Sequence, residues 1–203
     1  MKRFIYLIAA LAVSVTAAYA LPYNDDGDGQ EKARELTEKE QKKAEKALKK
    51  AEQERLDSLS FVLATRAIQD KHFVIVADRV SFRSGYTVNV NSTTNFVMQQ
   101  GDDVTVQLAF ERGFSGPNGL GGITVTGQAT RITSKFDKKG NFVYSMMVSG
   151  TAISADVSFT LPKNGTNCNV TVDSNFYPTR ITFWGELKPY NNSNEIFQGR
   201  PIP

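Results

Sequence analysis

From His72 onward, apolar and polar residues alternate with a period of two. Successive side chains of a strand point to opposite faces, so this pattern predicts antiparallel strands with one face towards a core and one towards water. Turn-forming groups such as Ser84-Gly85 and Lys163-Asn164-Gly165 recur at strand-length intervals. We therefore expect a mainly β domain over residues 71–203. It is either an antiparallel β-sandwich or a lipocalin-like barrel, of about nine or ten strands.

The clearest predicted strands have apolar core positions at Val104, Val106, Leu108 and Phe110, at Ile153, Ala155, Val157, Phe159 and Leu161, and at Val170 and Val172. The residues between them are expected to face water. In the first of these strands the water-facing residues are Thr105, Gln107 and Ala109.

One long charged α-helix is predicted before the strands, over residues 31–70. Its first part, residues 31–57, holds 9 basic and 8 acidic residues and no glycine or proline. Strong helix formers dominate, and pairs such as Glu45 and Lys49 have the favourable i,i+4 order. The apolar stripe is narrow and made mostly of small residues, so we interpret this part as a solvated spacer. A weak coiled coil, a partner-binding helix and a membrane-surface helix are the alternatives.

The N-terminus reads as an export signal. Residues 1–20 contain Lys2 and Arg3, then a short apolar run, then the small-x-small pattern Ala18-Tyr19-Ala20. This predicts a signal peptide cleaved after Ala20, with an N-terminal membrane anchor as the alternative. No later stretch has the length of a transmembrane helix, so we expect no membrane span after cleavage and a periplasmic or secreted protein.

Residues 21–30 are predicted to form a flexible leader. Asp25, Asp26 and Asp28 resemble the start of a calcium loop, but the terminal glutamate of an EF-hand and a preceding helix are both missing from the pattern. We therefore expect no calcium site there.

Composition excludes several kinds of chemistry. The 203-residue chain has one cysteine and one histidine, which rules out an intrachain disulfide and a multi-histidine metal site. Its formal net charge of +3 is too small to indicate a nucleic-acid partner. We accordingly expect no metal, no cofactor and no nucleic acid.

Several stretches resemble the domain-of-unknown-function 4251 family, whose members are exported proteins found mostly in Bacteroidetes. The resemblance covers about residues 55–200. The stretches that carry it include FVIVADRVSF (73–82), VNSTTNFV (90–97), GPNGLGGITVTGQA (116–129) and VSGTAISADVSFTL (148–161). Members often carry a lipoprotein cysteine after the signal, which this chain lacks. The resemblance implies the fold and the compartment, and it implies no activity.

Residues 114–122 form the most suggestive loop, because closely spaced glycines allow a backbone to approach a phosphate. A strand, and not a helix, follows them, so we interpret the loop as a wide hairpin connection with positive φ at several glycines. A small-ligand or partner-binding loop is the alternative.

No catalytic residue is assigned. Cys168 is in phase with Val170 and is predicted to be an inert buried thiol, and His72 is predicted to be an exposed residue at the start of a strand. Asp102 and Asp103 form a turn pair. Trp184 is predicted to pack in the core or at a barrel end, with an exposed sugar-stacking or protein-contact residue as the alternative.

We therefore predict a protein that is not an enzyme. The leading hypothesis is an interaction or structural β-domain that meets an unknown envelope protein. The alternative is a barrel or sandwich that binds a small apolar or sugar-like ligand. A pocket lined by residues such as Phe142, Tyr144 and Met146 would favour the alternative, and a filled interior would favour the first hypothesis.

Overall fold

The structure, a computed structural model, describes residues 27–110, 117–175, 179–191 and 196–202, with helix side chains described from residue 38. The predicted signal peptide, the leader before residue 27 and the side chain of Asp28 lie outside the described residues. The chain falls into two units, Met1–Ala47 and Leu48–Pro203. The second unit contains every strand and the C-terminal half of the helix.

Helix α1 spans Gly27–Gln69, so it begins four residues before the expected position. Lys71 follows with a φ of 55°, the left-handed conformation that often ends helices, and it leads directly into the first strand. The side chains of residues 38–56 are exposed. Ala64, Ala67 and Ile68 are buried in the main core, so the last turns of α1 are part of the β-domain.

Among the residues that the structure describes, nine strands follow the helix in an antiparallel sheet. They are β1 (His72–Phe82), β2 (Thr87–Asn89), β3 (Phe96–Gln100), β4 (Asp103–Ala109), β5 (Gly122–Phe136), β6 (Phe142–Ser149), β7 (Ser154–Leu161), β8 (Asn167–Ser174) and β9 (Arg180–Pro189).

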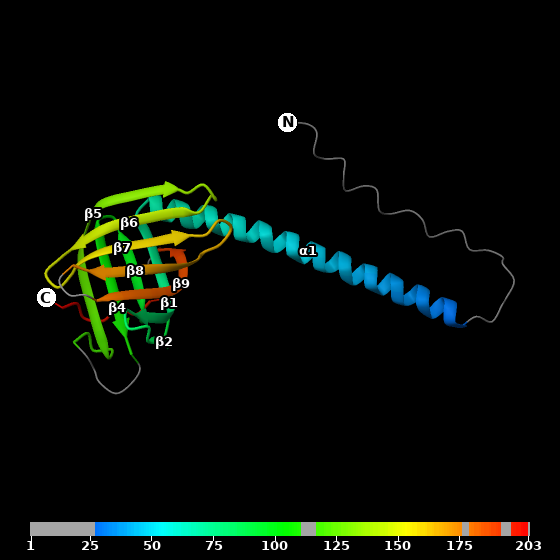
Figure 1. Cartoon of the computed structure of the whole chain (residues 1–203), viewed down its shortest axis with the longest axis horizontal. Coiled ribbons are helices and arrows are strands. Elements are labelled where there is room, and N and C mark those ends of the chain that lie inside the picture. The colour runs from blue at the N-terminus through cyan, green and yellow to red at the C-terminus, as the bar shows by residue number, and fades with distance from the viewer. Residues whose placement is uncertain (1–26, 111–116, 176–178, 192–195, 203) are drawn as a thin grey trace. The chain divides into compact units, whose positions relative to one another are not determined.

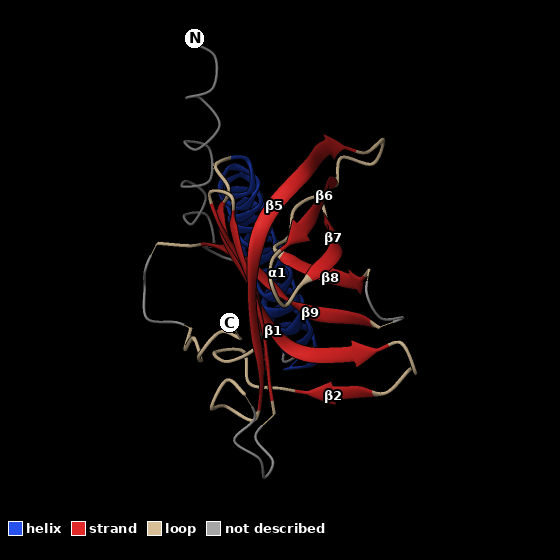
Figure 2. Ribbon diagram, turned by 90° about the vertical axis from the view of Figure 1, so that its left-hand side faces the viewer, coloured by secondary structure: helices blue, strands red, loops and turns tan. Residues whose placement is uncertain are grey.

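The sheet is a closed barrel and not a sandwich, which decides between the two predicted folds (Figure 1). Strands β3 to β9 pair in sequence order, and β1 pairs with both β3 and β9 to close the ring. Eight strands form this ring. The ninth, β2, pairs with β1 through residues 79–81, beyond the segment 72–76 that pairs with β3. Figure 2 shows β2 beside β1 at the edge of the sheet.

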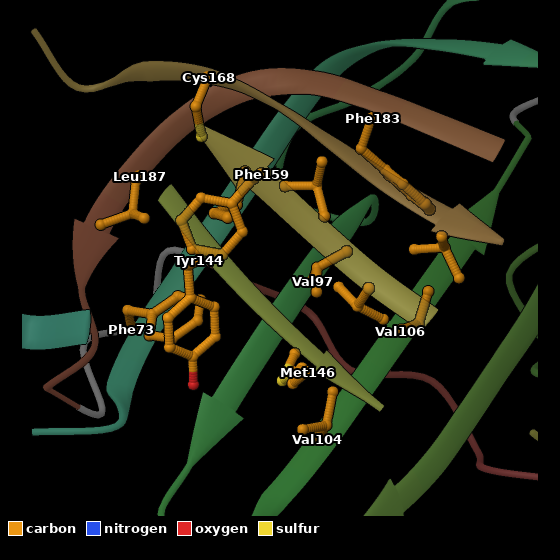
Figure 3. Close-up of a cluster of buried hydrophobic side chains, with 14 of the residues drawn as sticks. Phe73, Val97, Val104, Val106, Tyr144, Met146, Phe159, Cys168, Phe183 and Leu187 are labelled. Carbon is orange, nitrogen blue, oxygen red and sulfur yellow. The ribbon is translucent and has the colours of Figure 1, made fainter. Parts of the chain in front are cut away.

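The interior is packed with aromatic side chains near the end where α1 enters β1, called here the helix end. Phe73 meets Tyr144 and Phe159 edge-on, with ring centroids 5.8 and 5.6 Å apart, and Figure 3 shows the three rings together. All three residues are buried. Aromatic pairs of this kind stabilise a core beyond the area that they bury.

The prediction that Thr105, Gln107 and Ala109 face water is wrong, because all three are buried. The C-terminal segment 196–202 lies against this outer face. The Gln107 side chain donates to the Phe197 carbonyl oxygen at 2.7 Å and accepts from the Gly199 amide at 2.7 Å. The Ile202 amide donates to the Thr124 carbonyl oxygen at 2.9 Å. The outer face of β4 is polar because it binds this segment, and not because it is hydrated.

Candidate binding cleft

A cleft of about 1050 Å³ opens where β1 turns into β2, called here the hairpin end of the barrel. Three aromatic rings stand out in its lining. Phe82 stacks on Tyr86 with ring centroids 6.2 Å apart, and Phe110 lies 6.2 Å from Phe82. The other lining residues are Val88, Asn89, Val90, Asn91 and Ala109.

The cleft forms because neighbouring strands stop at different heights. Strand β3 pairs with β1 only as far as Val76 and Phe96, whereas β1 continues to Phe82. Beyond that height β2 takes the edge of β1, and the segment from Val90 to Asn95 connects β2 to β3. The β1–β2 hairpin and the end of β4 are thus left as the walls of the cleft.

Most of the cleft is apolar, and one of its rings is largely exposed to solvent. Four lining residues pack against the main core, namely Phe82, Val88, Val90 and Phe110. By contrast, Tyr86 is 64% exposed. Asn89 and Asn91 add amide groups at the edge. Such a combination of apolar walls with a few polar groups is typical of small-ligand sites.

The sequence pattern assigns none of these lining residues to a site. Phe82 and Tyr86 flank the Ser84-Gly85 turn, which the sequence showed only as a hairpin. Phe110 was predicted as a core position of its strand. The three rings meet because β1 and β4 lie on either side of β3, a relation that the local pattern does not contain.

Residues 117–121 belong to the connection from β4 to β5, which pair antiparallel, so the interpretation of the glycine loop as a hairpin connection is confirmed for its described part. Residues 114–116 of the predicted loop lie outside the described residues. Gly119 and Gly121 have φ values of 76° and 80°. The buried side chain of Asn118 organises the turn: its oxygen accepts from the amides of Leu120 and Gly122 at 2.9 and 3.1 Å. The amides of Leu120 and Gly122 are therefore used within the fold.

The cysteine and the histidine lie where the sequence predicted them. Cys168 is buried on β8, and burial raises the pKa of its thiol to about 12. His72 is exposed at the start of β1, with Nδ1 3.0 Å from the backbone oxygen of Asp70. A thiol with that pKa is a poor nucleophile at neutral pH.

The carboxylate pair at the β3–β4 turn is engaged by neighbouring side chains. Lys71 Nζ lies 2.7 Å from Asp102 Oδ1, and Gln128 donates to Asp103. Within the described part of the chain we find no group of three or more His, Cys, Asp and Glu residues able to hold a metal ion.

Trp184 is half-buried on β9, and the Arg79 guanidinium carbon lies 4.5 Å from the centre of its ring. This cation–π contact occupies one face of the indole.

The ligand-binding alternative predicts a pocket lined by residues such as Phe142, Tyr144 and Met146. These three side chains are buried at the centre of the core, so the interior at their level is filled.

The helix carries a second apolar surface. Five large apolar residues of α1 are exposed: Leu48, Leu56, Leu59, Val62 and Leu63. None of the described helices is both long enough and apolar enough to cross a membrane.

The fold and the cleft define a class of protein: a helix-preceded, eight-stranded antiparallel barrel with an added edge strand and an aromatic cleft at one end. The chain belongs to the DUF4251 family, described as a domain of unknown function, whose model matches residues 55–187. It is also similar to the crystal structure of a DUF4251 family protein from Bacteroides eggerthii, at 39% identity and a TM-score of 0.59. That match covers 70% of this chain and 95% of the other. No curated protein matches the chain.

Proposed function

We propose that the protein is a non-catalytic binding protein whose cleft at the hairpin end holds a ligand with an apolar, flat group. The observation that carries this proposal is the convergence of Phe82, Tyr86 and Phe110 on one cavity of about 1050 Å³. Cavities of that size bury most of a small ligand, and aromatic faces contribute binding energy with little loss of conformational entropy.

The absence of an enzymatic role is part of the same proposal. Cys168 and His72 lie on different strands, with the thiol buried and the imidazole exposed. Asp102 is paired with Lys71. None of these four residues lines the cleft.

Fluorescence of the apolar dye ANS, which gains intensity on apolar surfaces, tests the cleft. We expect saturable binding that Tyr86→Ala and Phe110→Ala each weaken about tenfold, because each change removes one aromatic wall. Phe136→Ala is the matched control, since Phe136 is a 55% exposed aromatic that contacts Phe142 and lies outside the cleft. Equal binding by all four proteins would contradict the proposal.

We further propose that the protein acts outside the cytoplasm, on the basis of the basic residues, apolar run and Ala18-Tyr19-Ala20 motif of its N-terminus. Mass spectrometry of the natively expressed protein should show Leu21 as the first residue. A retained Met1 would contradict export by a cleaved signal.

A further inference from the structure

Within the described part of the chain, strand β2 has one edge whose backbone hydrogen-bonding groups are not used. The Phe82 amide donates to the Tyr86 oxygen at 2.9 Å, and the Val90 amide donates to the Asp78 oxygen at 2.8 Å. Successive residues of an antiparallel strand bond to opposite sides, so Tyr86, Val88 and Val90 face β1. The N–H and C=O groups of Thr87 and Asn89 therefore point away from β1.

These outward groups have no partner among the described residues. In the β1–β2 register Asn89 lies opposite Arg79 and Thr87 opposite Ser81, which are the non-hydrogen-bonded positions. Both residues are exposed, and Asn89 lines the cleft. The unused edge and the apolar cavity thus adjoin each other.

The opposite wall of the cleft, at the end of β4, offers fewer backbone groups for hydrogen bonding to an added strand. The Ala109 amide donates to Asn95 Oδ1 at 2.8 Å, and the Phe110 amide donates to the Gly121 oxygen at 3.4 Å. An added strand therefore finds its hydrogen bonds on β2, while the end of β4 supplies apolar contact through Phe110.

We propose, building on the proposed function of the cleft, that its ligand is an extended segment of another polypeptide that adds to the edge of β2. Residues Thr87 to Asn89 offer about 10 Å of edge, at about 3.4 Å per residue. Paired antiparallel, the segment places every second side chain beside Val88 and Val90, facing the aromatic rings. Its other side chains lie beside Thr87 and Asn89, facing water.

The segment comes from a partner chain, because the described C-terminal segment of this protein is already bound elsewhere. The Arg200 amide donates to the Asn118 oxygen at 3.1 Å, and the Gly199 amide donates to the Gln107 side chain. These bonds hold residues 199–202 over β4 and β5, outside the edge of β2.

The peptide acetyl-KVTFTVK-amide tests this pairing, since its apolar residues alternate with polar ones. Isothermal titration calorimetry should show binding that N-methylation of its two threonines weakens at least about tenfold, because their amides face β2. N-methylation of its two valines is the matched control and should change affinity less than about threefold, because their amides face away.

A change in the protein tests the same contact from the other side. Asn89→Pro removes one outward amide and spares the bonds of β2 to β1, since proline is tolerated at an edge whose N–H faces outward. It should weaken peptide binding about tenfold, and the variant should keep the folded circular-dichroism spectrum of the parent protein.

The outcomes separate the two proposals. Dye binding without peptide binding overturns the strand-addition proposal and leaves the proposed function standing. Failure of both probes to bind overturns both. Peptide binding that resists both threonine N-methylation and Asn89→Pro also overturns strand addition, because it requires no bond to the edge of β2. Competition by a peptide of residues 21–26 of this chain would overturn the assignment to a partner chain.

Discussion

The Tyr144 hydroxyl donates a 2.8 Å hydrogen bond to Gln99 Oε1 inside the barrel. Both side chains are fully buried, and the Gln99 amide nitrogen donates in turn to the Gly101 backbone oxygen at 2.9 Å. The two bonds satisfy polar atoms that would otherwise be costly to bury. They allow a glutamine from β3 and a tyrosine from β6 to fill the helix end of the core.

Tyr144→Phe should lower the free energy of unfolding by about 1–3 kcal/mol, because it leaves Gln99 Oε1 buried without its donor. Urea denaturation followed by circular dichroism measures the change. Tyr86→Phe is the control, since Tyr86 is exposed, and its effect should be within about 0.5 kcal/mol. An unchanged urea midpoint for Tyr144→Phe would show that water replaces the lost donor.

Ile68→Ala should destabilise the protein by about 2–4 kcal/mol, because Ile68 is 1% exposed and belongs to the main core. Leu59→Ala on the same helix should change stability by less than about 0.5 kcal/mol, since Leu59 is 50% exposed. Thermal unfolding of the two variants provides the comparison. Similar melting temperatures would mean that the last turns of α1 add nothing to the core.

Gln107→Ala should release the C-terminal segment and destabilise the fold by about 2–3 kcal/mol, because it removes partners from Phe197 and Gly199 at once. Hydrogen exchange at the Gly199 amide reports the release directly. We expect exchange there to accelerate while the amides of β7, which shares no hydrogen bond with the described segment, keep their protection. Uniform acceleration would instead indicate global unfolding.

The alternation of residues was enough to predict the strands, their inner faces and the burial of Cys168, because each depends on local geometry. It failed for Gln107, whose partner Phe197 is 90 residues away. The binding cleft was missed for a similar reason. Phe82 and Phe110 meet only after β1 and β4 take their places beside β3, and a strand pattern does not specify which strands become neighbours.

Gly119→Ala and Gly122→Ala should differ in their cost to stability although both belong to the glycine-rich segment 114–122. Gly119 has a φ of 76° and open space where alanine would place its β-carbon, so alanine costs about 1 kcal/mol of backbone strain. At Gly122 the added carbon would overlap the Leu108 carbonyl oxygen, and we expect a loss of at least about 3 kcal/mol. Urea midpoints of the two variants measure this difference, and equal midpoints would contradict it.

The buried thiol of Cys168 predicts a loss of stability in alkali. Burial raises its pKa to about 12 in the folded protein, from an ordinary value near 9. The contribution of the protonated thiol to the free energy of unfolding is therefore complete below pH 9. It declines as the pH rises from 9 towards 12, by about 1.4 kcal/mol per pH unit.

The variant Cys168→Ala lacks this titration. Between about pH 8 and pH 10.5 it should lose roughly 2 kcal/mol less than the parent protein, as measured by urea unfolding. Burial also raises the pKa of Tyr144, but that effect is common to both proteins and cancels in the comparison. Parallel losses in the two proteins would show that the thiol ionises in the folded state as easily as in the unfolded one.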